Sequence, residues 1–111
     1  MLVTTILLAA MAPSPTAAVD SSRAAFTKCL RTDLKKSLDE KKTPADYEAA
    51  IKAACQPERD TFRKAVIALD RASGDSEADA TDNADMQVDD YHANFIDKFK
   101  DYTESKTLPA E

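Results

Sequence analysis

The chain has 111 residues, of which 32% are charged and 6% are aromatic, and its formal net charge is −5 at neutral pH. An acidic chain repels the phosphate backbone of nucleic acids, so the composition argues against nucleic-acid binding. A single glycine, no tryptophan and many alanine, lysine, aspartate and glutamate residues favour helix, and the length suits one domain with a modest core.

The first segment has the pattern of an export leader. Residues 1–12 are mostly apolar, and a small-residue, proline-rich stretch follows over 13–18. The apolar run is much shorter than the roughly 20 residues that span a bilayer, which favours a cleaved leader over a membrane anchor. Thr16 and Ala18 suit the positions before a cleavage site, so we predict a signal peptide over 1–18 and one domain over 19–111. No lysine or arginine precedes the apolar run, which departs from the usual pattern.

These features predict a bacterial protein that is periplasmic or secreted. We expect no stable membrane insertion after the leader is removed. We also expect no lipid anchor, since no cysteine follows the apolar run.

The first helix is predicted over 21–41, with Asp20, Ser21 or Ser22 as its N-cap. Apolar residues recur along it every four positions, which predicts one buried face: Phe26, Leu30, Leu34 and Leu38. The second helix is predicted over 44–72, because Thr43 followed by Pro44 is a helix-start signal. Pro57 lacks the amide hydrogen that the helix needs there, so we expect a kink or a short break immediately after Cys55; the apolar stripe resumes in phase beyond it, which favours a kinked helix.

The last helix is predicted over 76–104, after the only glycine in Ser73-Gly74-Asp75 has ended the second. Its apolar residues follow a three-four pattern: Ala84, Val88, Tyr91, Phe95, Phe99 and Tyr102. We expect this stripe and Met86 to belong to the core rather than to contact a cofactor, and we predict no cofactor.

The two cysteines lie thirteen residues on either side of Lys42. In an antiparallel hairpin, residues equidistant from the turn meet at the same level, so Cys29 and Cys55 can form a disulfide, worth roughly 3 to 4 kcal/mol in the chain-entropy account. Their spacing does not fit a redox-active pair. The sequence therefore predicts an all-α fold, an antiparallel three-helix bundle made of a helical hairpin and a C-terminal helix, cross-linked by one disulfide.

An acidic segment over 75–90 holds seven aspartate or glutamate residues and no basic one. A calcium loop starting at Asp75 would need glycine and glutamate where Ala80 and Met86 stand, so the match fails. On a helix, Asp82, Asp85 and Asp89 share one face, which favours a solvated stripe over a weak site for a cation or a cationic partner.

His92 is the only histidine, and it shares the face of Asp85 and Asp89. Di-metal helical bundles need matching ligands from other helices, which offer no second histidine, so we expect no metal site and a partly exposed side chain. No nucleophile and base form a recognisable pair, so we predict that the protein is not an enzyme.

The favoured function is that of a small exported envelope protein that binds a protein or peptide partner through a groove or through its acidic face. An apolar residue outside the core, such as Ile67, Met86 or Ile96, would mark a partner contact or the seam of a homodimer. Two alternatives remain. One is a small-molecule or metal carrier that uses the bundle interior and His92. The other is an acid-responsive, chaperone-like protein whose acidic segment loosens the last helix when protonated.

Overall fold

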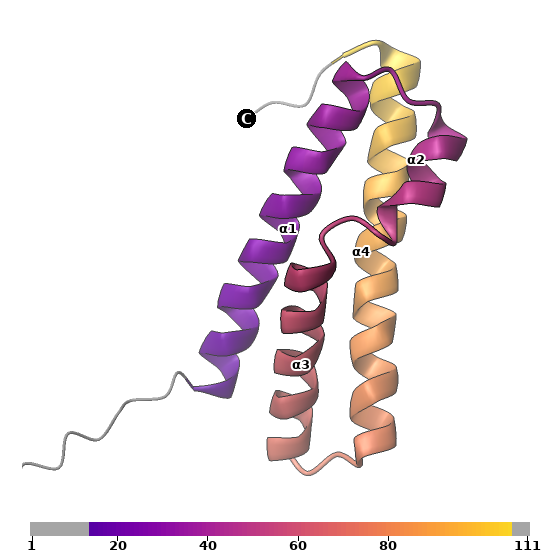
Figure 1. Cartoon of the computed structure of the whole chain (residues 1–111). Helices are drawn as coiled ribbons and strands as arrows, with labels where there is room; N and C mark the ends of the chain where they lie inside the picture. Colours follow the sequence, from indigo (N-terminus) through magenta and orange to yellow (C-terminus); the bar gives the residue numbers. More distant parts are fainter. Residues whose placement is uncertain (1–13, 108–111) are drawn as a thin grey trace, which may run out of the picture.

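The protein folds as a helical bundle (Figure 1). The computed structural model describes residues 14–107, which form α1 (Pro15–Asp39), α2 (Pro44–Ile51), α3 (Gln56–Ala72) and α4 (Glu77–Ser105), and no strand occurs among them. The predicted all-α class is confirmed. None of the helices in the described range is long and apolar enough to cross a membrane.

The first helix begins earlier than predicted. Ser14 caps it by accepting a hydrogen bond from the amide of Ala17 at 3.1 Å, and Pro15 occupies the first turn, which is a stronger start signal than the later serines. Ser22 is buried and its hydroxyl donates to the carbonyl of Ala18 at 2.7 Å, so it does not cap a helix. Residues 15–18 of the predicted leader therefore belong to α1, while 1–13 lie outside the described residues.

The predicted second helix is two helices. α2 ends at Ile51, residues 52–55 form a turn, and Cys55 takes the left-handed conformation with φ 59°, so the break precedes Pro57 instead of coinciding with it. Pro57 fits in the first turn of α3 because amides there need no partner within the helix. The break changes the packing, since α2 packs against α4, whereas α3 packs against both α1 and α4 (Figure 1).

The core runs along all four helices. Most residues of the predicted stripes are buried, as are Phe62 and Val66 of α3, whereas Leu38, Tyr91 and Tyr102 are partly buried against the core. Two ring arrangements organise it: Tyr47 stacks on Phe99 with centroids 4.2 Å apart, and Phe26 meets Phe62 and Tyr91 at 5.8 Å each. Met86, which we expected in the core, is 57% exposed.

The helix ends agree with their capping residues. α1 ends at Asp39, two residues before the predicted end, because Lys41 adopts φ 57° and the amide of Lys42 donates to the carbonyl of Ser37 at 3.1 Å. Gly74, with φ 101°, follows the end of α3 as predicted. Ser76 caps α4, whose bounds lie within one residue of the prediction.

Candidate functional site

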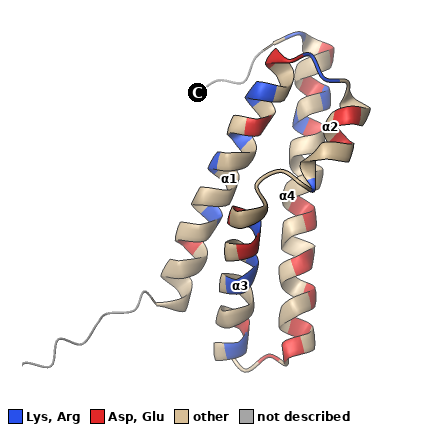
Figure 2. Cartoon of the chain, viewed as in Figure 1, with Lys and Arg blue, Asp and Glu red and all other residues tan. Residues whose placement is uncertain are grey.

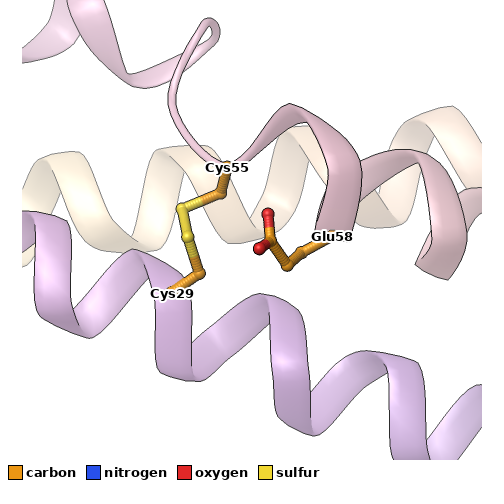
Figure 3. A group of neighbouring side chains, drawn as sticks. All are labelled: Cys29, Cys55 and Glu58. Carbon is orange, nitrogen blue, oxygen red and sulfur yellow. A yellow bond between two sulfur atoms is a disulfide. The ribbon is translucent and has the colours of Figure 1, made fainter.

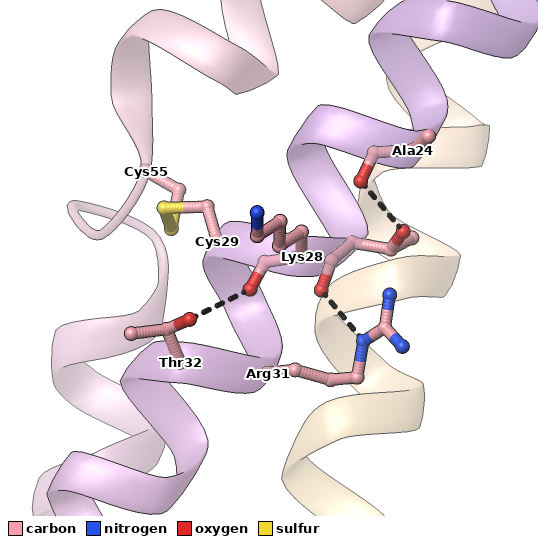
Figure 4. Close-up of a disulfide and its surroundings, with 7 residues drawn as sticks. Ala24, Lys28, Cys29, Arg31, Thr32 and Cys55 are labelled. Carbon is pink, nitrogen blue, oxygen red and sulfur yellow. Dashed lines mark hydrogen bonds between the residues drawn. A yellow bond between two sulfur atoms is a disulfide. The ribbon is translucent and has the colours of Figure 1, made fainter. Parts of the chain in front are cut away.

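The predicted disulfide between Cys29 and Cys55 is present (Figures 3 and 4). The sulfur atoms are 2.04 Å apart and the Cα atoms 6.0 Å apart. Cys29 lies in the middle of α1, and Cys55 immediately precedes α3. The bond therefore joins α1 to the start of α3, the helix that packs against α1, and not to α2 as a simple hairpin would have it.

Glu58 lies beside the disulfide, so that its carboxylate and the two sulfur atoms are within 4.8 Å of one another (Figure 3). This is the one cluster of three potential metal-ligating side chains within residues 14–107. Because a thiolate is the metal-binding form of cysteine, the bonded sulfurs are not available as ligands. Neighbouring polar side chains on α1 bond to their own helix, as Thr32 does to the carbonyl of Lys28 at 3.1 Å (Figure 4).

The acidic residues for which we favoured a solvated stripe over a weak cation site are exposed on α4, whose first half carries acidic but no basic residues (Figure 2). Asp82 is exposed and has no ion pair within the described chain. Asp85 pairs with Arg63 of α3, with 2.7 Å between the carboxylate oxygen and Nε, and this hydrogen bond lowers the pKa of Asp85. Together with Asp89 and His92, they form no group of three donors within 4.8 Å.

His92 is buried, contrary to our expectation of a partly exposed side chain. It is 5% exposed, and its ring lies edge-on to Phe26 at a centroid distance of 6.1 Å and an angle of 83°. Neither ring nitrogen has a hydrogen-bond partner in the described structure. Burial lowers the pKa of His92; Asp89 opposes this shift, and Arg59 and Lys52 add to it.

A cleft of about 540 Å³ adjoins His92, and we call it the His92 cleft. It lies between α3 and α4, with one residue from the turn before α3. It is lined by Lys52, Arg59, Asp60, Arg63, Asp85, Val88, Asp89 and His92.

Most charges of the His92 cleft are paired within the protein. Arg63 pairs with Asp85, and the guanidinium of Arg59 donates to Asp60 at 3.1 Å and to the carbonyl of Lys52 at 2.9 Å. The ammonium of Lys52 and the carboxylate of Asp89 have no ion pair with any described residue. The cleft thus offers one unpaired charge of each sign beside a buried imidazole.

The sequence had identified only the α4 side of this cleft. Lys52, Arg59 and Arg63 were missed, because they become neighbours of His92 only when α3 packs against α4. The spacing of four between Arg59 and Arg63 was a usable signal, since it places both on one face of a helix.

The cleft lining limits the chemistry on offer. Its described residues include no hydroxyl or thiol side chain, so the arrangement provides charge pairing, hydrogen bonding and proton binding. Comparisons with protein-family models, with curated proteins and with solved structures gave no match for this chain.

Proposed function

We propose that this protein is an exported, non-enzymatic binding module of the bacterial envelope, and that the His92 cleft receives a peptide segment of a partner protein. The disulfide supports an oxidising compartment, where such bonds persist. In this proposal α2 and α3 together take the place of the second helix in an antiparallel three-helix bundle.

The observation that carries the proposal is the pair of free charges in the cleft. Lys52 and Asp89 line the same opening, and neither is paired with a described residue. A peptide segment with one acidic and one basic group can pair with both, whereas a partner of a single charge leaves one of them unmatched. The surrounding ion pairs, such as Arg63 with Asp85, hold the walls in place before binding.

The charge of the chain supports a protein partner over a nucleic acid. The net charge is −5, and the first half of α4, which contributes to one side of the cleft, carries acidic and no basic residues (Figure 2). Such a surface steers a partner whose basic residues flank the bound segment, and it repels phosphate.

Site-specific photo-cross-linking tests the proposal. A photoreactive amino acid at Asp60, which lines the cleft without being one of its two free charges, is expected to give a discrete adduct in the native envelope fraction, and the same group at Lys100, on α4 but outside the cleft, is not. Asp89→Lys should abolish the adduct, because it replaces the free anion by a cation. Equal labelling from positions 60 and 100, or an adduct that survives Asp89→Lys in a folded variant, would contradict the proposed site.

A further inference from the structure

We propose that His92 is a proton-controlled switch, so that its protonation in mildly acidic conditions separates α4 from α1 and α3 and opens the His92 cleft. The proposal concerns the ligand-free chain. It can therefore hold or fail independently of the binding function proposed above.

The position of His92 makes its charge matter to three helices. Its ring meets Phe26 of α1 at 6.1 Å, and Phe26 in turn meets Phe62 of α3 and Tyr91 of α4, both at 5.8 Å. Phe62 and Tyr91 are themselves 5.7 Å apart. A charge on His92 therefore appears inside a cluster of four rings that joins α1, α3 and α4.

The hydrogen bonding of the imidazole favours its neutral form. Both ring nitrogens are buried without a partner among the described residues. A neutral imidazole has one donor, while an imidazolium has two and carries a charge, and burying a charged donor without an acceptor is the more unfavourable state. Because both nitrogens are buried, water can supply the missing acceptors only after the packing around the ring has opened.

The charged groups around His92 come from three parts of the chain. Asp89, one turn earlier on α4, favours the imidazolium, whereas Arg59 of α3 and Lys52 before it oppose it. α1 presents the apolar ring of Phe26. Arg59 is held on this side by its bond to the carbonyl of Lys52 at 2.9 Å. Two cations and burial therefore outweigh one anion.

The direction of the pH effect follows from this balance. Burial lowers the pKa of His92 in the folded protein below the ordinary histidine value near 6.5. The folded state is then fully stable above about pH 6.5 and loses stability as the pH falls toward the folded pKa, because the open state binds the proton more tightly. His92 is the only histidine and ordinary carboxyl groups titrate near 4, so the interval from about pH 7 to 5 isolates its side chain.

Equilibrium unfolding of the full, disulfide-bonded chain in guanidinium chloride tests the switch. Between about pH 7 and pH 5, the unfolding equilibrium constant of the unmodified protein should rise by up to about 25-fold, the limit for a group with an unfolded pKa near 6.5 and a much lower folded one. His92→Phe keeps an aromatic ring and removes the titrating group. The ratio of its unfolding equilibrium constants at pH 5 and pH 7 should therefore approach one. Tyr91→Phe is the matched control, because it alters the same ring cluster and should keep the pH dependence.

Two further measurements locate the effect. The NMR titration of the His92 ring in the unmodified protein should have its midpoint below 6.5, which does not depend on any variant folding. Amide hydrogen exchange, corrected for its intrinsic pH dependence, should become faster in α4 around His92 at the lower pH. The proposal would be overturned if the His92 ring titrated with a midpoint at or above 6.5, or if amide exchange in α4 did not change with pH. It would also be overturned if the unfolding constant of the unmodified protein changed with pH no more than that of His92→Phe.

Discussion

Replacing the disulfide tests how the chain is held between α1 and α3. Cys29 and Cys55 are separated by 26 positions, so the bond closes a loop in the unfolded chain. The loop-closure relation assigns about 3.5 kcal/mol to a loop of this size. Domains of this kind have total stabilities of about 5 to 15 kcal/mol, so Cys29→Ala combined with Cys55→Ala should greatly lower the free energy of unfolding.

The conformation of Cys55 refines this expectation. Its φ of 59° and ψ of 32° lie in the left-handed region, which disfavours any residue with a Cβ atom. Glycine at this position relieves the steric penalty, and part of the gain is offset by the greater freedom of glycine in the unfolded chain. We therefore expect Cys29→Ala with Cys55→Gly to be about 1 kcal/mol more stable than Cys29→Ala with Cys55→Ala.

Guanidinium chloride unfolding of the three proteins at neutral pH, followed by circular dichroism, gives both differences. The stability order should be the unmodified protein, then the Cys55→Gly double variant, then the Cys55→Ala double variant. If the two double variants were equally stable, the left-handed turn at 52–55 would not carry the stated strain. If removing the bond lowered stability by less than about 1 kcal/mol, the loop-closure reasoning would be wrong for this chain.

Two further predictions concern the backbone conformation of Lys41 and the buried hydroxyl group of Tyr47. Lys41→Gly should raise the free energy of unfolding by about 1 kcal/mol, because Lys41 has φ 57° at the end of α1; Lys42→Gly is the control and should give no gain in the same thermal or chemical unfolding assay. Tyr47→Phe should keep the stack on Phe99 and either lower the stability by less than about 1 kcal/mol or raise it, because the buried hydroxyl has no partner among the described residues. A larger loss of stability on thermal unfolding would contradict this expectation.

The sequence predicted those features that depend on local spacing. Apolar residues at three and four positions identified the buried faces of the helices, and Gly74 correctly predicted the boundary between the last two helices. The disulfide was predicted from its symmetry about Lys42, and that pairing is correct although the helices it joins are α1 and α3. The symmetry was sufficient because the chain reverses direction once between the cysteines, whichever helix follows.

The position of the break between α2 and α3 could not be read from the sequence. Residues 52–55 contain neither glycine nor proline, and the apolar stripe keeps its phase across them, so no local signal ends the helix there. The left-handed turn at Cys55 arises from tertiary packing, in which α2 lies against α4 while α3 lies against α1. Pro57 was a correct sign of interruption, but it marks the first turn of the next helix.

The burial of His92 was misread because two patterns overlap on α4. Its spacing from Asp85 and Asp89 places it on an acidic face, which suggested exposure. It is also four residues after Val88 and three before Phe95, and this spacing places it equally well on the buried stripe. Packing decides between the two, because the ring of Phe26 on α1 covers the imidazole.

The disulfide and His92 act on the same end of α3, and together they limit how the proposed opening can occur. The amide of Arg59 donates to the carbonyl of Cys55 at 2.9 Å, so the residue that opposes the charge on His92 is one helical turn from the cross-link to α1. The start of α3 cannot move far from α1 while the bond is intact. In the proposed switch, the separation must therefore come mainly from α4, which is linked covalently to α3 by the turn at 73–76 and held against it by bonds such as Arg63–Asp85 and Asn83–Asp70. The covalent bond thus keeps α1 and the start of α3 together when α4 moves in the proposed switch.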